Sequence, residues 1–430
     1  MTEKKDVVLL GAGPCGLAAA WYLQNHGCTS FHLYEVTDHA GGLSSSVIDA
    51  NGFTWDIGGH VFHNADPTVD ALFSYVTKNK FTTYMRRAFV QIQNTFVSYP
   101  FQYALFQLPP ALQKACIEGV TTSKKIPSPT SFYDWILQTF GFGMATYFFF
   151  PYNRKMWNYP LEKMGWEWTS KKVATAKEQE KGTAWGSNAQ FFIPNVGGMG
   201  SVFSSMAAAL QQNISYHKQA VAIDGKKHIV TFSDGSSVSY GVLFSTIPLT
   251  SLTIMTKGIR LPKATTLAST GVIAIGIGIK GTVPELLKTV HWIYVPDPKI
   301  PFFRVSVYSN YGTHNAPSGA WSLLFELSYD GKTPVKKDVV IRQVITTAMA
   351  CGYIPKDADI VDRFYIEAPL AYPVPTKNRD AILSRVTPIL EAHDIFPRGR
   401  FGSWKYEEGN MDHVMLAGIA WAHAYMKKHV

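Results

Sequence analysis

Cysteine is scarce in this chain, and its spacing carries no metal or disulfide signal. The 430 residues include four cysteines, Cys15, Cys28, Cys116 and Cys351, which lie far apart and form no CxxC pair. A disulfide framework and a zinc site are therefore not indicated. This cysteine usage predicts a reduced, intracellular protein.

Charged residues are also few, and they form no blocks. They make up 17% of the chain, and 40 basic against 31 acidic residues give a formal net charge of +9. The basic residues are spread along the sequence, unlike the clusters that bind nucleic acid. We therefore expect no nucleic-acid partner, and we attribute the positive excess to an anionic small molecule.

The apolar runs are too interrupted for a signal peptide or a membrane span. The N-terminal apolar stretch is broken by glycines and a proline at residues 11–14. Residues 135–153 lack charge for the length of a span but include Gln138, Asn153 and Pro151. We interpret them as part of a buried helical region, and we expect a cytoplasmic protein without membrane insertion.

A strand, a helix and a second strand are predicted at the N-terminus. Residues 6–10 and 31–35 are short apolar runs, and residues 14–25 between them carry Ala and Leu at helical spacing. The pattern is that of a βαβ unit at the start of the first domain. At about 150 residues per domain, the chain length predicts two or three domains in all.

The turn inside this unit carries the glycine pattern GxGxxG. Its glycines are Gly11, Gly13 and Gly16, and Pro14 opens the helix. They let the backbone approach a pyrophosphate at the helix N-terminus. Glu35 ends the second strand, where a carboxylate can accept hydrogen bonds from ribose hydroxyls. The pattern predicts a dinucleotide site.

Two further Gly-Gly pairs, at residues 41–42 and 58–59, follow this unit. Together with GxGxxG and the glutamate they are similar to the flavoprotein pattern that cradles FAD. The alternative is a pair of ordinary turns, with His60 as a core histidine. The residues expected at the cofactor from this region are Gly42, Leu43, Ser44, Gly59 and His60.

The rest of the chain changes periodicity several times. Helical segments are predicted over 109–172, and strands with turns over 220–246 and 271–326. Residues 182–217 carry no charged side chain and are rich in Gly, Ser and Asn, which favours a loop and a candidate flap. Residues 412–428 have the spacing of a helix.

Aromatic and basic positions suggest a ligand without proving one. Residues 99–102 offer an aromatic face and an amide to a pyrimidine base, but they fit a core edge equally well. Residues 151–157 have the same ambiguity. Arg304 presents a planar fork suited to a diphosphate, or is a solvated strand residue. Four tyrosines in predicted loops are better explained by packing than by a chemical role: Tyr294, Tyr311, Tyr372 and Tyr406.

Taken in order, these segments resemble the UDP-galactopyranose mutases of the eukaryotic type. The similarity covers nearly the whole chain, through GPCGL, DIGGHV, YPFQ, PYNRKMW, WGSNA, PFFR, SNY, AYPVPT and RGRFGSWKYEEGN. It implies an α/β fold with a Rossmann-like FAD-binding domain, an inserted helical domain and an antiparallel β-sheet domain. The implied FAD-binding parts are 1–95, 184–250 and 381–430, the helical substrate domain is 96–183 and the sheet substrate domain is 251–380.

The resemblance also implies a reaction. Family members are isomerases that interconvert UDP-galactopyranose and UDP-galactofuranose for glycan biosynthesis, without net redox change, through an adduct between the sugar and N5 of reduced FAD. NADPH or NADH would reduce the flavin, a UDP-sugar would be the ligand, and the oligomeric state stays open. The alternatives are the same chemistry on another nucleotide sugar, such as a UDP-pentose or modified hexose, an amine-oxidase-type flavin oxidase, and a binding protein without activity.

The family's site residues can be placed on this sequence. The uridine pocket falls on Tyr99, Phe101, Gln102, Asn153 and Trp157. The diphosphate contacts fall on Arg304, Tyr294, Tyr372 and Tyr406. Positions near the sugar and flavin fall on His60, Asn188, Tyr311, Arg400, Asn410 and Met411. Catalytic roles are implied for His60, Lys172, Asn188, Arg304 and Arg400.

Two flaps that close over substrate correspond to residues 169–177 and 184–190. The first differs from the family pattern, because Lys172 stands where the family has a second diphosphate-binding arginine. Lysine keeps the charge but lacks the planar fork. We therefore expect flap closure or substrate choice to differ from the family's.

Overall fold

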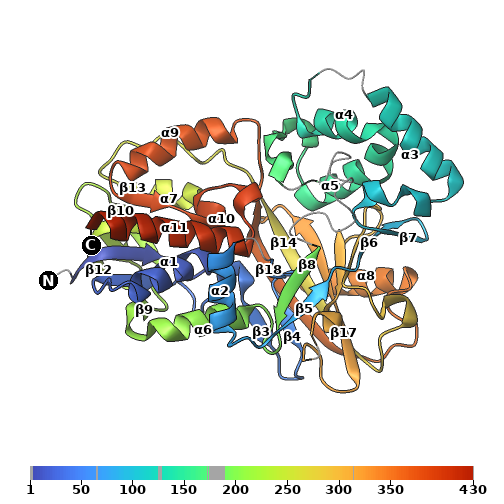
Figure 1. Ribbon diagram of the computed structural model, residues 1–430, viewed down its shortest axis with the longest axis horizontal. Coiled ribbons are helices and arrows are strands. Elements are labelled where there is room, and N and C mark those ends of the chain that lie inside the picture. The colour runs from blue at the N-terminus through green and yellow to red at the C-terminus, as the bar shows by residue number, and fades with distance from the viewer. Residues whose placement is uncertain are drawn as a thin grey trace.

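The protein is described by a computed structural model, which covers residues 3–63, 66–123, 128–171, 173, 189–312 and 314–429. It is a mixed α/β fold built around two large sheets and a group of helices (Figure 1). The first sheet and its helices occupy the left of the view, with both chain ends. The second sheet lies at the lower right and the helical group at the upper right.

The first sheet has eight strands in the order β13-β10-β11-β12-β1-β2-β9, with β19 beside β12. Its central strand β1 pairs in parallel with both β2 and β12. The bounds are β1 Glu3–Leu10, β2 Phe31–Tyr34, β9 Ile214–Ser215, β10 Ala220–Asp224, β11 Ile229–Phe232, β12 Ser237–Ser245, β13 Thr256–Lys257 and β19 Ile395–Pro397.

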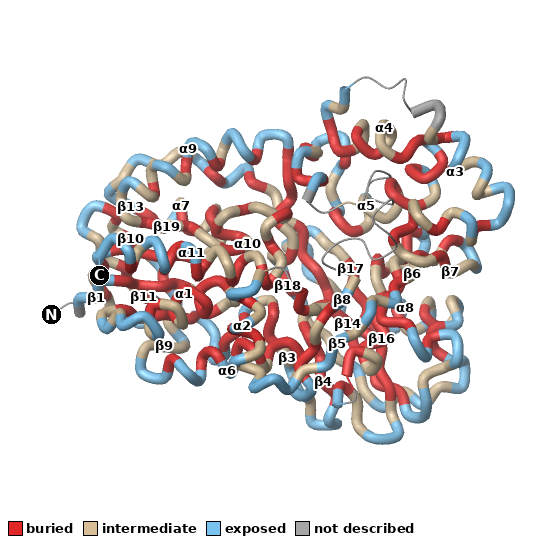
Figure 2. Tube along the Cα trace, viewed as in Figure 1, coloured by how far each residue is buried: buried red, intermediate tan, exposed pale blue. Residues whose placement is uncertain are grey.

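Helices cover both faces of this sheet. In β1, Val7 and Leu9 pack with α1 (Pro14–Asn25), α6 (Gly200–Leu210) and α11 (Met411–His429). The alternate residues Val8 and Leu10 pack with α7 (Leu249–Met255) and α9 (Arg379–Glu391) on the other face. All four are buried (Figure 2), which is the continuous apolar pattern of a parallel strand. The predicted βαβ unit and C-terminal helix are confirmed.

The second sheet has seven strands in the order β18-β14-β17-β16-β15-β6-β7. Its pairs are antiparallel except β6 with β15. The bounds are β6 Ala88–Ile92, β7 Thr95–Ser98, β14 Ser269–Lys280, β15 Trp292–Tyr294, β16 Arg304–Val307, β17 Ala320–Tyr329 and β18 Ile360–Pro373.

The strand β14 shows why this sheet packs closely. Its isoleucines face a core completed by α8 (Lys337–Ala350), and small residues alternate with them. A Cβ on Gly276 would lie 2.5 Å from the ring of Trp55. Glycine is therefore required where β4 (Thr54–Asp56) crosses the sheet.

The helical group contains α3 (Pro110–Ser123), α4 (Phe132–Met144), a π-helical turn (Ala145–Phe149) and α5 (Phe150–Trp157). The hydroxyl of Ser131 accepts a hydrogen bond from the Asp134 amide and caps α4. The uncharged segment 135–153 lies within these helices, several of whose side chains are buried. No helix of the described chain is long and apolar enough to cross a bilayer.

Two segments differ from the sequence interpretation. Residues 189–217 are not simply a loop: they form strand β8 (Gln190–Pro194), which pairs with β5 (Phe81–Met85), and helix α6. Their lack of charge reflects burial, because Phe191, Phe203 and Met206 lie in the core. In addition, β6 within segment 1–95 belongs to the second sheet. The predicted domain boundaries otherwise stay predictions.

Asp56 is a buried carboxyl at the end of β4, which pairs with β3 (Ser46–Ile48). Burial raises its pKa to about 7, although hydrogen bonds from Ser46 and Tyr308 act in the opposite direction. Between about pH 4 and 7 the folded protein therefore holds a proton that the unfolded chain has lost. Its contribution to stability should fall as pH rises through this window, by at most about 1.4 kcal/mol per pH unit.

We expect Asp56→Asn to flatten this dependence in urea unfolding measured from pH 4 to 8. The exposed carboxylate variant Asp357→Asn is the matched control and should keep the slope. Equal slopes for wild type and Asp56→Asn would show that Asp56 is already ionised in the folded protein.

Candidate active site

A cavity of about 430 Å³ opens among the helical group, the second sheet and the segment before α11. Its walls combine backbone glycines, aromatic rings and two arginines. The structure brings to it, from the predicted set, Leu43, Ser44, Gly59, His60, Tyr99, Gln102, Asn153, Tyr294, Arg304, Tyr311, Tyr372, Arg400, Tyr406, Asn410 and Met411. Positions more than 300 residues apart in sequence thus share one cavity.

Two predicted substrate residues do not reach the cavity surface. Phe101 and Trp157 are fully buried and do not line the cavity. Phe101 packs on Phe148, and Trp157 packs edge-on to Tyr406. Burial of large apolar rings explains why they support the wall instead. Lys172, Asn188 and most of both predicted flaps lie outside the described residues.

The glycine loop between β1 and α1 is built for close approach. Gly11 has φ +100°, and a Cβ on Gly16 would lie 2.0 Å from the carbonyl oxygen of Gly11. A Cβ on Gly13, at the start of α1, would meet no atom within 4 Å. Open space beside the N-terminus of a 12-residue helix fits a phosphate group.

Glu35 stands beside this space at the end of β2. Its Oε2 accepts a hydrogen bond from the Ala12 amide at 2.7 Å, and its Oε1 accepts one from the Thr37 amide at 2.9 Å. The Thr37 hydroxyl is a second donor to Oε1, at 2.9 Å, whereas Oε2 has a further lone pair. The fixed carboxylate therefore fits a ribose next to the phosphate.

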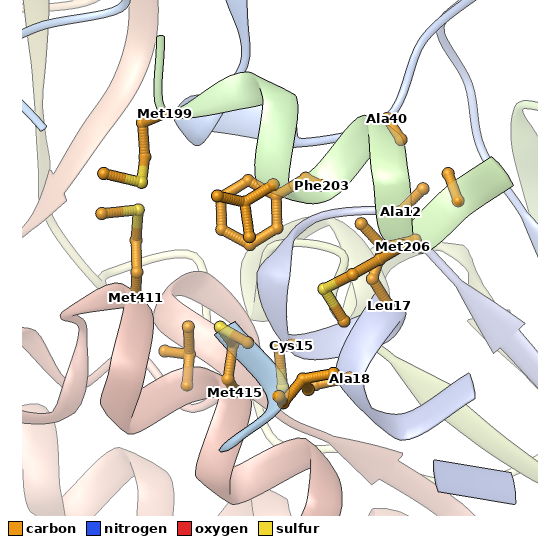
Figure 3. Close-up of a cluster of buried hydrophobic side chains, with 14 of the residues drawn as sticks. Ala12, Cys15, Leu17, Ala18, Ala40, Met199, Phe203, Met206, Met411 and Met415 are labelled. Carbon is orange, nitrogen blue, oxygen red and sulfur yellow. The ribbon is translucent and has the colours of Figure 1, made fainter. Parts of the chain in front are cut away.

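A sulfur-rich core holds α1 in place behind this loop. Figure 3 shows Cys15 of α1 packed beside Met415 of α11, with Met199 and Met411 pointing toward one another. A Cβ on Gly418 would lie 2.3 Å from the Cys15 carbonyl oxygen, so the two helices touch along their backbones. Met411, at the start of α11, also lines the cavity. The contact between α1 and α11 therefore links the glycine loop to the cavity wall.

The guanidinium of Arg304 is already paired with a carboxylate of the protein. It lies directly opposite Glu326 in the β16–β17 pairing, and its Nε and Nη2 both donate to the Glu326 carboxylate. Burial lowers the pKa of Arg304, but the charge and hydrogen bonds of Glu326 outweigh burial and raise that pKa well above its ordinary value. Arg304 therefore reaches the cavity as half of a paired charge.

Arg400 is charged without a carboxylate partner among the residues that the structure describes. Its Nε donates to the Ala371 carbonyl and its Nη1 to the Gly409 carbonyl, each at 2.8 Å. Its guanidinium lies 5.2 Å from the ring centre of Tyr372. Burial lowers its pKa. A ligand anion at this wall would compensate that charge.

Partly buried tyrosines line the same cavity as the two arginines. The Tyr294 ring lies 4.8 Å from Tyr99 and 5.3 Å from Tyr152. Burial raises the pKa of Tyr99, Tyr152 and Tyr372. The hydroxyls therefore stay protonated at neutral pH and can donate hydrogen bonds to an anion.

His60 follows the second glycine pair and lines the cavity. Burial and the charges of Arg304 and Arg400 lower its pKa to about 3. The imidazole is therefore neutral at physiological pH. It can accept or donate a hydrogen bond but carries no charge toward a ligand.

The sequence reasoning missed several wall residues. Glu326 is the most consequential, and its signal is a lone carboxylate within the apolar strand β17. Tyr152 lies within residues 151–157, whose pattern fits core packing and ligand binding equally well. The aromatic wall from the helical group had no separate signal; it contains Phe132, Trp135, Phe148, Phe149 and Trp168.

Fold and site define a dinucleotide-binding protein in which residues that follow the glycine loop, Leu43 and Ser44, also line the cavity. The family model for flavin containing amine oxidoreductases matches residues 14–425. A crystal structure of reduced UDP-galactopyranose mutase matches with TM-score 0.94 and 34% identity, covering 99% of this chain and 94% of that chain. The chain therefore belongs to the flavin-containing amine oxidoreductases and, among them, to the UDP-galactopyranose mutase family.

More distant structures share the fold. Cyclohexylamine oxidase from Brevibacterium oxydans matches with TM-score 0.72 at 15% identity, covering 99% of both chains. Putrescine oxidase bound to putrescine matches with TM-score 0.70 at 17% identity, covering 99% of this chain and 100% of that chain. FAD is the cofactor of this chain, and the open space at Gly13, the Glu35 carboxylate and the segment 409–411 fit it.

Proposed function

We propose that this protein is an FAD-dependent isomerase that interconverts UDP-galactopyranose and UDP-galactofuranose without net redox change. The observation that carries the proposal is the cavity itself. Its lining combines the glycine pair and His60, which we assign to the flavin side, with arginines and tyrosines suited to a diphosphate, and Arg304 Nη2 donates to the Gly59 carbonyl at 3.4 Å. The identity of 34% to a UDP-galactopyranose mutase over nearly the full chain supports the choice of reaction.

The charge of the cavity favours an anionic ligand. Glu326 neutralises Arg304, and His60 is neutral. Among the described residues Arg400 is compensated by carbonyl dipoles and by the rings of Tyr372 and Tyr406, not by a carboxylate. The remaining positive charge attracts a diphosphate. It would repel the ammonium group of an amine, which argues against an amine oxidase.

Each part of the wall has a proposed role. Tyr99, Gln102 and Asn153 would hold the uracil by stacking and hydrogen bonds. The diphosphate would lie against Arg304 and the hydroxyls of Tyr294, Tyr372 and Tyr406. Lys172 and Asn188 remain proposed contacts from the flaps.

Bound FAD in its reduced form supplies a nucleophilic nitrogen toward the anomeric carbon. The protein's own groups then have three tasks. Arg304 and Arg400 stabilise charge that develops on the departing diphosphate. His60, Tyr311 and Asn410 would orient the sugar hydroxyls, and the aromatic wall excludes water.

The test is an anaerobic assay of the purified holoprotein with UDP-galactofuranose, before and after reduction by dithionite. Chromatography separates the furanose and pyranose forms. We expect conversion to the pyranose form only after reduction, because the oxidised flavin lacks the required electron pair. A panel of UDP-pentoses and modified hexoses tests the alternative substrates. Equal activity with oxidised flavin, or hydrogen peroxide release with amines, would refute the proposal.

A further inference from the structure

Tyr406 reaches the cavity from a very short element, the 3-10 turn η11 (Tyr406–Glu408). Its ring packs edge-on to Trp157 at 4.7 Å and to Trp168 at 5.4 Å. A single turn of this kind has little stability of its own. Something outside the turn must therefore hold Tyr406 in place.

The next residue provides that anchor. The Glu407 carboxylate accepts two hydrogen bonds from Arg379, from Nη1 and from Nη2, each at 2.8 Å. The side chains are only 5% and 9% exposed, for Arg379 and Glu407 respectively. Arg379 also donates from Nε to Asp380 at 2.9 Å, but the Asp380 side chain is 66% exposed. Of the two ion pairs that Arg379 makes, with Asp380 and with Glu407, the buried one is the pair with Glu407.

The same arginine is tied to the segment before the first predicted flap. The Arg379 amide donates to the Thr376 carbonyl, and the Gly165 amide donates to the Pro375 carbonyl at 2.8 Å. Gly165 leads into η6 (Glu167–Lys171), which carries Trp168. The ion pair therefore joins η11, which carries Tyr406, to residues 375–379. The same residues are hydrogen-bonded to Gly165, just before the element η6 that carries Trp168.

We propose that Arg379 and Glu407 are positioning residues that set the affinity of the cavity for the UDP part of the substrate. Neither residue lines the cavity, so they act through the placement of Tyr406 and Trp168. A bidentate guanidinium–carboxylate pair fixes direction as well as distance, which a single hydrogen bond does not. The inference rests on the proposed function only in taking UDP as the ligand.

The experiment compares UDP binding, by tryptophan fluorescence titration of the holoprotein, in Glu407→Gln and Asp380→Asn. Each variant removes one carboxylate charge from Arg379, and the first breaks the buried pair while the second leaves it intact. We expect Glu407→Gln to raise the Kd for UDP about tenfold or more, with FAD content unchanged. Asp380→Asn should bind UDP like the wild type. In steady-state kinetics the Glu407→Gln effect should fall on KM more than on kcat.

A lower melting temperature with unchanged UDP affinity would assign the pair a purely structural role and overturn the inference. If Glu407→Gln does not fold, the double variant Arg379→Met with Glu407→Met removes both buried charges together. UDP affinity in that variant equal to wild type would likewise overturn it. Failure of the wild type itself to bind UDP would instead refute the proposed function.

Discussion

Replacing Arg304 with alanine should reduce kcat/KM by roughly 30-fold to several thousand-fold, equivalent to about 2–5 kcal/mol of transition-state stabilisation. Two effects add in this variant. The diphosphate loses a cation, and Glu326, which is buried, loses the partner of its charge. An unpaired buried carboxylate beside the site would repel the substrate's own negative charge.

The two effects can be separated with a second substitution. In the variant Arg304→Ala with Glu326→Gln, the repulsive charge is gone while the direct contact is still missing. We expect kcat/KM to recover partly, measured with FAD occupancy checked for each protein. Identical kcat/KM in the single and double variants would mean that Glu326 has no electrostatic influence on the ligand.

Adding one methyl group at Gly16 should be far more damaging than adding one at Gly13, although both belong to the same glycine pattern. The Gly16 methyl would lie 2.0 Å from the Gly11 carbonyl oxygen, so backbone must move and we expect a loss of several kcal/mol of folding stability. The Gly13 methyl meets no protein atom within 4 Å, and the backbone there is extended, with φ −76°.

Gly13→Ala should therefore fold normally without cofactor but bind FAD poorly, because its methyl group fills the space that fits a phosphate. Thermal unfolding of the apoprotein measures the first statement, and flavin fluorescence after gel filtration measures the second. Retention of FAD by Gly13→Ala at the wild-type level would place the phosphate elsewhere along α1.

Local patterns predicted the cofactor side of this molecule well. The strand, turn and helix at residues 6–25 depend on neighbours in sequence, and the structure confirms β1 and α1 there. The C-terminal helix follows from its apolar spacing. In both helices the apolar residues recur at helical spacing and form one buried face. Tertiary contacts to that face therefore stabilise the helix that the local sequence already favours.

The substrate side could be predicted only through the family resemblance, and then incompletely. Arg304 and Glu326 are 22 residues apart, and only the register of β16 with β17 places them opposite one another. Sequence spacing does not determine that register. For the same reason Phe101 and Trp157 looked like ligand contacts, although the packing of Phe148 and Tyr406 leaves them in the layer behind the cavity.

The contact between α1 and α11 determines when the flavin can be held during synthesis. The glycine loop leaves the ribosome early, but β12, which pairs with β1, emerges more than 220 residues later, and α11, which packs on α1, comes last. Until then the apolar face of α1, including Cys15 and Ala19, has no partner from α11. We therefore expect the chain to retain FAD only after α11 has been synthesised, with that face of α1 exposed until then.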